Sequence, residues 1–357
     1  MTSIDVARSR LPHEGFAGQT AIITGGCSGI GLCTARLIHE LGGNVMMGDI
    51  HPPSAADSAW MSKSMSQFQG ISENLHVPRY EYCDVTQWSS VCSLFEKAFS
   101  TFGRIDIVLV NAGVNDVGDV FFSTDDPGTS TFTSTSTSSQ PPPPPLPQPR
   151  EPNYKTIDVN VKGTVNTIVL GIHYLRRNAD GGSIVLTASL AGYFATEGMP
   201  IYTASKHGEF NFPLRTRSTQ REEVILIIFL KAMVGLLRAL SPSASKLGVT
   251  MALVAPGMTE TSLLASLPGV DVKADTNDDL EVLWKQMQDM GIPSQKPDVV
   301  ADAICYLINQ GAAAAGKGLF VQGGEVFDLE KELAVARPDW LSQRMGYMLT
   351  EKGAVWK

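Results

Sequence analysis

The sequence predicts an α/β protein with a doubly wound (Rossmann) parallel sheet of about seven strands, in a single domain with two insertions. Short apolar runs alternate with segments of helical periodicity, and a glycine-rich turn separates the first apolar run from the first helix. Polar or acidic residues stand at the ends of several runs. This alternation favours a parallel sheet with helices on both faces, and ligands then bind at the carboxyl ends of the strands.

The first predicted strand, residues 20–24, is followed by the turn GGCSGIG at 25–31 and a helix that extends to Leu41. Glycines let the backbone approach a pyrophosphate, and a helix N-terminus offers unpaired N–H groups and the positive end of the helix dipole. This context favours a dinucleotide site over an ordinary glycine-rich turn. Its expected cofactor-binding residues are Gly25, Ser28, Gly29, Ile30 and Gly31.

Asp49 ends the second predicted strand, residues 44–48. A carboxylate at this place accepts hydrogen bonds from the ribose hydroxyls and repels a 2′-phosphate, so it favours NAD over NADP. No Arg or Lys lies in the glycine turn or directly after Asp49. The alternative is a solvated loop aspartate.

The rest of the domain, which we place at residues 19–325, continues the same alternation. Further strands are expected at 80–85, 105–110, 184–189, 249–254 and 319–321, and helices at 88–99, at 157–172 and around Tyr202. Residues 1–18 and 326–357 are expected to be terminal extensions. The Ser/Thr/Pro-rich segment 123–150 is expected to form a disordered or polyproline II surface excursion, with SH3-type docking as the alternative.

Tyr202 and Lys206 are the candidate catalytic pair. Four residues is just over one helical turn, so the two side chains share one helix face. A free tyrosine has a pKa near ~10, and a nearby cation favours the phenolate that a general base needs. Ser189 is expected to offer a hydroxyl to the same oxygen. The alternative is a solvated helix face, because this spacing is common.

Composition narrows the class of protein. The net charge is −8, mean hydropathy is near zero and no basic block occurs, which argues against nucleic acid or an anionic membrane surface as partner. The five cysteines are odd in number without a CxxC, so reduced thiols are expected rather than disulfides. No metal site is suggested. The start lacks an apolar leader and the longest apolar run, 224–230, is too short for a membrane span, so a cytoplasmic location is expected.

Together these motifs resemble the short-chain dehydrogenase/reductase family, in the right order along the chain. They are TGxxxGxG at 24–31, Asp49, Asp84, NAG at 111–113, Asn160, Ser189, YxxxK at 202–206 and Pro256-Gly257. Within the family, residues 189–192 and 202–208 most resemble the NAD-dependent 15-hydroxyprostaglandin dehydrogenase group and its fungal relatives.

The resemblance implies a role for each matching residue. Tyr202 is the acid/base, Lys206 lowers its pKa and holds the nicotinamide ribose, and Ser189 orients the substrate oxygen. Asn160 holds a water in the proton relay. The remaining contacts fall on the coenzyme: Asp84 and Val85 at the adenine, Asn111 at the adenosine side, and Thr259 and Thr261 at the carboxamide. The family usually has Val where Thr259 stands. The resemblance also implies a homodimer or tetramer.

Residues 209–233 depart from the family pattern. Joining Gly208 to Val234 restores one continuous helix, whereas the polar run with Pro213 is expected to end the catalytic helix about two turns after Tyr202. We interpret the segment as a foreign insertion, such as a retained intron, which sequencing of the mature transcript decides. Its run 224–230 is an aggregation hazard unless covered, and the segment puts ordinary dimerisation in doubt.

The expected reaction is reversible hydride transfer between NAD and a secondary alcohol or ketone. Apolar residues favour a bulky lipid-like or polyketide-like substrate if they line a pocket, and core positions are the equal alternative. They are residues 192–195, Met199, Met258, Leu263, Leu264 and Leu267. A catalytically silent NAD-binding protein is the competing hypothesis, because the insertion interrupts the active-site helix. A scaffold role through the proline tract is a third.

Overall fold

The structure is a computed structural model of the chain. It describes residues 3–12, 15–67, 77–116, 152–194, 199–207, 209–211, 229–263, 281–282, 284–285, 289, 291 and 293–340. The Ser/Thr/Pro-rich segment, Leu264, Leu267, Ala195 and most of 209–233 lie outside the described residues, so the expectations for them stay predictions.

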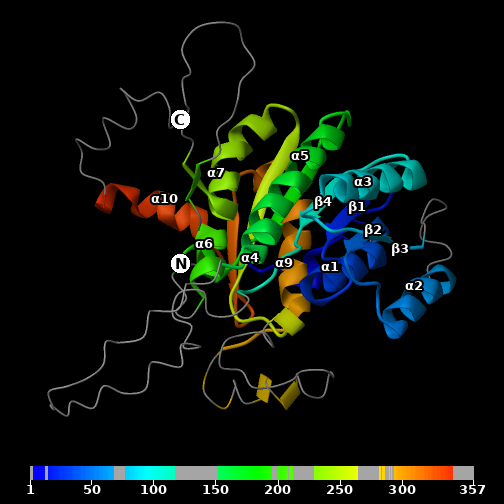
Figure 1. The fold of residues 1–357 in the computed structure, drawn as a ribbon, viewed down its shortest axis with the longest axis horizontal. Coiled ribbons are helices and arrows are strands. Elements are labelled where there is room, and N and C mark those ends of the chain that lie inside the picture. Colours follow the sequence, from blue (N-terminus) through cyan, green and yellow to red (C-terminus); the bar gives the residue numbers. More distant parts are fainter. Residues whose placement is uncertain are drawn as a thin grey trace, which may run out of the picture.

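One central sheet has eight strands in the order β10-β9-β8-β5-β4-β1-β2-β3 (Figure 1). The strands are β1 (Thr20–Thr24), β2 (Asn44–Asp49), β3 (Arg79–Tyr82), β4 (Ile107–Val110), β5 (Gly182–Thr187), β8 (Val249–Pro256), β9 (Gly318–Gln322) and β10 (Glu325–Asp328). Seven neighbouring strands of this sheet pair in parallel: β3, β2, β1, β4, β5, β8 and β9. β10 pairs antiparallel with β9 and forms one edge. The prediction of a doubly wound parallel sheet is confirmed, with the strand order reversing between β1 and β4.

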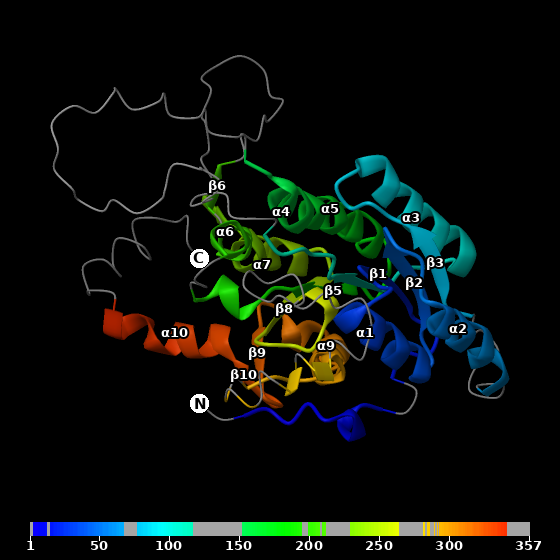
Figure 2. The same ribbon diagram turned by 60° about the horizontal axis from the view of Figure 1, so that its bottom comes forward.

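Helices cover both faces of this sheet (Figure 2). They are η1 (Arg8–Arg10), α1 (Gly29–Glu40), α2 (Ala55–Gln67), α3 (Trp88–Phe102), α4 (Lys155–Ile157), the π-helical segment η2 (Asp158–Gly163), α5 (Thr164–Leu175), η3 (Leu190–Gly192), α6 (Pro200–His207), α7 (Ala232–Ser245), α9 (Pro297–Asn309), η5 (Gly311–Ala314) and α10 (Leu329–Trp340). α1 and α9 pack on one face, and α3, α5 and α7 pack on the other.

The strands are apolar without alternation because both of their faces are buried. Ile23 of β1 lies in the core under α1 and α9, whereas the adjacent Ile22 lies in the core under α3 and α5. Both side chains are fully buried. Each side chain of this size contributes about 1.5–3 kcal/mol on burial, which is why parallel strands read as continuous apolar runs.

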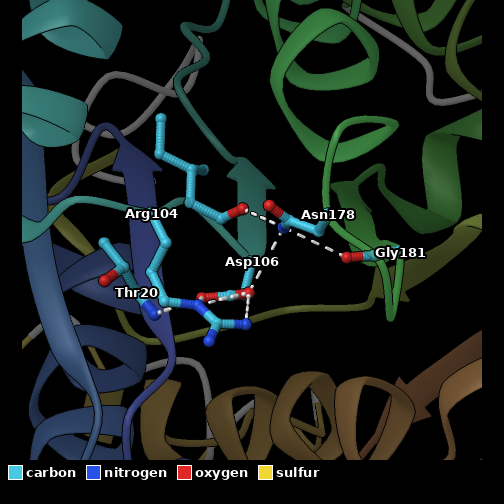
Figure 3. Close-up of polar contacts among 6 residues, drawn as sticks. Thr20, Arg104, Asp106, Asn178 and Gly181 are labelled. Carbon is cyan, nitrogen blue, oxygen red and sulfur yellow. Dashed lines mark hydrogen bonds and ion pairs between the residues drawn. The ribbon is translucent and has the colours of Figure 1, made fainter.

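A polar network around Asp106, which lies directly before β4, joins the amino ends of neighbouring strands (Figure 3). Its carboxylate accepts hydrogen bonds from the backbone N–H of Thr20 at 2.9 Å and from the guanidinium of Arg104 at 2.6 and 2.9 Å. The Asn178 amide donates to the same carboxylate at 3.3 Å and to the carbonyl of Gly181 at 3.2 Å. These contacts fix the starts of β1, β4 and β5 relative to one another.

Helix α6, which carries Tyr202 and Lys206, ends at His207, within the two turns predicted from the sequence. A small antiparallel pair follows, β6 (Glu209–Asn211) with β7 (Phe229–Lys231), and α7 begins directly after it. A Cβ placed on Gly192 would lie 3.2 Å from the carbonyl oxygen of Lys206 and 3.3 Å from the side chain of Val234. The end of α6 and the start of α7 therefore meet the same turn of chain. Whether 209–233 is a retained intron stays a prediction.

The N-terminal segment packs on the domain rather than leaving it. Figure 2 shows it running beneath β10 and α9 towards α1. The backbone N–H of Ile4 donates to the carbonyl of Val326 at 2.7 Å, and Arg8 lies 3.2 Å from Glu40 and 3.5 Å from Asp302. Phe16 is fully buried. Within the described ranges, none of the helices combines the length and the apolar character that crossing a membrane requires.

Candidate active site

A cavity of about 1350 Å³ opens at the carboxyl ends of the strands. It joins the glycine turn after β1, the ends of β2 and β4, the turn after β5, helix α6 and the segment after β8. Of the predicted site residues, it is lined by Gly25, Ser28, Gly29, Ile30, Asp49, Asp84, Val85, Asn111, Ser189, Tyr202, Lys206, Thr259 and Thr261. Gly31 and Asn160 do not line it.

The glycine turn has the conformation that a close approach to an anion needs. Gly25 adopts a φ of 64°, in the left-handed region that favours glycine, and its N–H donates to the carbonyl of Gly48 at 2.8 Å. A Cβ on Gly31 would clash with the carbonyl oxygen of Gly25. Gly31 therefore lets α1 pack tightly against the turn, which explains why it matters without lining the cavity.

Asp49 is held in place by backbone donors. The Cys27 N–H donates to its Oδ2 at 3.2 Å, and the His51 N–H donates to its Oδ1 at 3.1 Å. The carboxylate thus faces the cavity with further acceptor capacity on each oxygen. Burial, reinforced by the charges of Asp49 and Asp57, raises the pKa of the Cys27 thiol to about 12. The thiol beside the turn is therefore neutral and unreactive.

Asn111 ties the end of β4 to the glycine turn. Its side-chain amide donates to the carbonyls of Thr24 at 3.2 Å and Gly25 at 3.0 Å, and its backbone N–H donates to the Thr24 hydroxyl at 3.1 Å. Asp84 accepts from the backbone and hydroxyl of Thr86 at 2.9 and 2.8 Å. Both residues line the cavity, and their contacts to a coenzyme stay predictions.

Tyr202, Ser189 and Lys206 meet at the other end of the cavity. The Tyr202 side chain is buried, and burial raises its pKa, with the charge of Asp116 adding to the rise and a hydrogen bond with the Ser189 side chain opposing it. Ser189 also caps η3, because its hydroxyl accepts from the N–H of Ala191 at 3.1 Å. The three side chains are therefore together, as predicted.

Lys206 lies close to the Tyr202 ring, and the lowering of the Tyr202 pKa that the resemblance assigns to it stays a prediction. Its Nζ lies 5.5 Å from the centroid of the Tyr202 ring, and it donates to the carbonyl of Thr187 and lies against Met233 Sδ, each at 3.3 Å. In this arrangement the pKa of Tyr202 is raised rather than lowered, since burial outweighs the hydrogen bond with Ser189. Burial also lowers the pKa of Lys206 to about 8, which leaves the ammonium charged at neutral pH.

Asn160 lies behind the cavity, fully buried in the π-helical segment η2. Its Oδ1 accepts from the N–H of Val114 at 2.8 Å, and its Nδ2 donates to the carbonyl of Val114 at 2.9 Å and to the Ser205 hydroxyl at 3.0 Å. The amide therefore links the loop after β4 to α6. Since both ends of the amide already have protein partners, the expected proton-relay water stays a prediction.

The hydroxyl of Thr259 points into the protein rather than into the cavity. The hydroxyl donates to the carbonyl of Gly257 at 3.1 Å and accepts from the side-chain amide of Gln295 at 3.3 Å. Gln295 also donates to the carbonyl of Val321 at 2.9 Å. This buried glutamine, which the sequence reading missed, explains how a hydroxyl replaces the usual valine. A carboxamide contact at Thr259 would then use its backbone.

The expected apolar pocket is only partly formed by the predicted residues. Met199, Met258 and Leu263 line the cavity, whereas residues 192–194 do not. The Tyr193 hydroxyl donates to Glu330 of α10 at 2.8 Å, and Phe194 is 60% exposed. Of the two alternatives for residues 192–194, the cavity wall is therefore not the one that the structure favours, and Tyr193 has a polar partner on α10 instead.

Asp116 is a cavity residue that the sequence reading missed. It lies in the loop after β4, is 8% exposed, and its Oδ2 accepts from the backbone N–H of Ile201 at 3.1 Å. A single acid in an irregular loop gives no periodic signal, so only its position shortly after the NAG motif pointed to it. Among the described residues, no group of three or more His, Cys, Asp or Glu side chains is arranged to hold a metal ion.

The sequence pattern of the short chain dehydrogenase family matches residues 19–139 and 145–227, which is more than half of the chain. The chain belongs to this family. It is similar to short-chain dehydrogenase/reductase prx4 of Penicillium roqueforti, with 25% identity over 362 residues, 96% of this chain and 86% of the relative. It is 28% identical to 5'-hydroxyaverantin dehydrogenase stcG of Emericella nidulans over 337 residues, 88% of each chain.

One further relative and one solved structure are also similar to the chain. Cis-4-hydroxycyclohexanecarboxylate dehydrogenase of Sinomonas cyclohexanicum is 28% identical over 314 residues, 87% of this chain and 98% of the relative. The solved structure of levodione reductase superimposes with a TM-score of 0.58 at 19% identity, covering 87% of this chain and 98% of that one, which supports the fold alone. Family membership makes the chain an oxidoreductase of alcohol or ketone groups that uses NAD or NADP. The resemblance to the 15-hydroxyprostaglandin dehydrogenase group stays a prediction.

Proposed function

We propose that the protein catalyses reversible hydride transfer between NAD and a bulky apolar secondary alcohol or its ketone. One observation carries the proposal: a single cavity is lined at one end by the glycine turn and Asp49, and at the other by Ser189, Tyr202 and Lys206. The first group suits a dinucleotide, and the second suits proton transfer to or from an alcohol oxygen.

The chain's own residues divide the work as follows. In the oxidative direction, the Tyr202 phenolate takes the hydroxyl proton of the substrate, while Ser189, already hydrogen-bonded to the phenol, steadies the substrate oxygen. The Lys206 ammonium, buried beside the tyrosine ring, is proposed to hold the nicotinamide ribose and to stabilise the phenolate. When bound, the nicotinamide supplies hydride transfer chemistry. Holding the reacting groups in one geometry contributes as much as the proton transfer itself.

Asp49 supports NAD as the coenzyme rather than NADP. Its carboxylate is fixed by two backbone N–H groups at the end of β2, where it faces the cavity. A second negative charge from a 2′-phosphate would meet this carboxylate without a neighbouring Arg or Lys in the turn. The apolar substrate is supported by Met199, Met258 and Leu263 in the cavity wall. The alcohol group is supported by relatives named as dehydrogenases of hydroxylated compounds.

The test is a turnover screen that follows NADH and NADPH production from cyclohexanol, menthol and borneol. We expect turnover with NAD, and greater kcat/KM for the bulkier alcohols. Tyr202→Phe should reduce kcat by about 10²–10⁴-fold, the usual contribution of a positioned acid/base, without changing NAD affinity. Tyr306→Phe is the matched control, because it removes a phenol hydroxyl on α9, outside the cavity. Unimpaired turnover by Tyr202→Phe would refute the assignment.

A catalytically silent NAD-binding protein remains the second candidate because of one contact. Met233, at the end of the 209–233 segment, lies 3.3 Å from Lys206 Nζ and so takes up one direction in which the ammonium donates. If this contact keeps Lys206 from holding the nicotinamide ribose and stabilising the phenolate, NAD should raise the melting temperature while no alcohol yields NADH. The same screen on a chain lacking residues 209–233 would then recover turnover.

The proposal extends to assembly and location. By family resemblance a homodimer or tetramer forms, and the β6–β7 pair beside α6 and α7 puts the usual contact in doubt. Analytical ultracentrifugation of the full chain and of the chain without residues 209–233 compares the two states. Five free cysteines support a reducing, cytoplasmic location, which fluorescence microscopy of the tagged chain tests.

A further inference from the structure

Asp116 places a buried carboxylate directly on the first turn of the catalytic helix. Its Oδ2 accepts from the N–H of Ile201 at 3.1 Å. This N–H group belongs to the first turn of α6, where backbone donors have no partner within the helix. A carboxylate brought from another part of the chain therefore caps the helix that carries Tyr202 and Lys206.

The second oxygen of Asp116 is unusual for a buried carboxylate. Its Oδ1 is buried and has no hydrogen-bond partner among the residues that the structure describes. Burial raises the pKa of Asp116, and hydrogen bonds from the backbones of Tyr202 and Ile201 and from the Thr156 side chain oppose the rise. The carboxylate thus lies in the cavity wall with no cation bonded to it in the described residues.

Few other charges act on this part of the cavity. The groups that influence the pKa of Tyr202 are its burial, the Ser189 hydrogen bond and the charge of Asp116. On the helices and turns that pack against α6, the remaining charged side chains are Lys155, Asp158 and Lys162, which are exposed, and Arg238, which is paired with Glu330. On α6 itself, Lys206 lies over the ring face rather than at Asp116. Among the described residues, Asp116 is the carboxylate whose charge acts on Tyr202.

We propose that Asp116 is a positioning residue for Tyr202: its carboxylate holds the first turn of α6, and its negative charge opposes formation of the phenolate. Asp116 therefore keeps Tyr202 in its protonated form up to a higher pH than an uncharged side chain at position 116 would allow. This inference rests on the proposed function for its kinetic test, but its ionisation test needs no turnover.

The kinetic test compares the pH profiles of wild type and Asp116→Asn with menthol and NAD. Asparagine keeps an oxygen for the Ile201 N–H and removes the charge. The acid limb of kcat/KM for oxidation should therefore move to lower pH, which raises kcat/KM at least about threefold at pH values below that limb. A purely structural role would lower kcat without moving the limb. Asp116→Ala, which also removes the acceptor, should lower kcat about tenfold at its own pH optimum.

The ionisation test reads Tyr202 without substrate. The near-ultraviolet difference absorbance between a chain and its Tyr202→Phe counterpart follows the Tyr202 tyrosinate alone as pH rises. In the Asp116→Asn background the tyrosinate should form at lower pH than in wild type. A downward shift without any turnover would sustain the inference and reject the proposed function, and turnover with no shift would do the reverse.

Asp298→Asn is the control for both tests, because it removes an exposed carboxylate on α9 that does not line the cavity. It should leave the pH profile and the tyrosinate titration as in wild type. If Asp116→Asn does not fold, Asp116→Ser gives the same test of sign with a smaller uncharged side chain. An unchanged or upward shift in a folded variant would overturn the inference.

Discussion

Two buried aspartates stand on either side of β4, and their surroundings differ. Asp106, before the strand, is 6% exposed and accepts hydrogen bonds from Thr20, Arg104 and Asn178, so both oxygens have partners and a cation neutralises them. Asp116, after the strand, is 8% exposed, caps α6 with one oxygen and leaves the other without a partner. A buried carboxylate that is paired with a cation and fully hydrogen-bonded holds parts of the fold together. A buried carboxylate without a cation changes the ionisation of nearby groups through its charge. Contacts at the amino ends of the strands thus fix the strands relative to one another, whereas the carboxyl ends border the cavity of the proposed active site.

The largest expected effect comes from replacing each of these two aspartates by asparagine, one before β4 and one after it. Asp106→Asn should lower the free energy of unfolding by about 1.5–3 kcal/mol, because it weakens charge-assisted hydrogen bonds and leaves a donor facing donors. The estimate is kept low because the Arg104 side chain is 47% exposed and solvent screens its charge. Asp116→Asn should change stability by less than about 1 kcal/mol, since it keeps an acceptor and removes a desolvated charge.

Urea denaturation followed by circular dichroism measures both variants, and Asp5→Asn serves as a control at an exposed carboxylate. Kinetics give the complementary result. Asp106→Asn should retain wild-type pH dependence of turnover at a temperature where it is folded, whereas Asp116→Asn should not. Equal losses of stability at the two positions would remove the distinction between the two ends of β4.

A second expectation concerns pH at the carboxyl edge. Burial lowers the pKa of Lys206 to about 8, so its ammonium is present below that pH and is lost as pH rises through it. If the ammonium holds the coenzyme, NAD affinity measured by fluorescence titration should be flat below about pH 8 and fall above it. Lys206→Arg is the control, because a guanidinium stays charged and its affinity should remain flat. An affinity for wild type that does not change through this range would argue against a charge contact from Lys206.

Features that local sequence determines were predictable. β1 was predicted with its observed bounds, and the glycine turn was placed correctly, because an apolar run that meets glycines and then a helical pattern has one ordinary structure. The early end of α6 could also be predicted, since the polar run after Gly208 cannot continue an apolar helix face. In each case the residues that decide the structure are close together in the chain.

Features that depend on distant partners were not predictable. Asp116 acts through Ile201, 85 positions away, and Tyr193 turns from the cavity to Glu330, 137 positions away. No period or spacing in the sequence relates such pairs. Helix α9 was missed although Pro297 marks its first turn and apolar residues follow at helical spacing. β10 was missed because it forms a tight antiparallel edge with β9 at the border of the expected domain.

The smallest expected effect concerns Thr259, which separates a side-chain contact from a backbone contact at the carboxyl edge. Thr259→Val removes the hydroxyl that accepts from Gln295 at 3.3 Å, while Gln295 keeps its bond to the Val321 carbonyl at 2.9 Å. Stability should therefore fall by only about 0.5–1.5 kcal/mol. NAD affinity should change less than about twofold, because the hydroxyl is directed into the protein and not towards the cavity. Gln295→Met, which removes the partner instead and also the bond to the Val321 carbonyl, should lower stability further in urea denaturation and leave NAD affinity equally unchanged. A large loss of NAD affinity in Thr259→Val alone would mean that the hydroxyl itself binds the coenzyme.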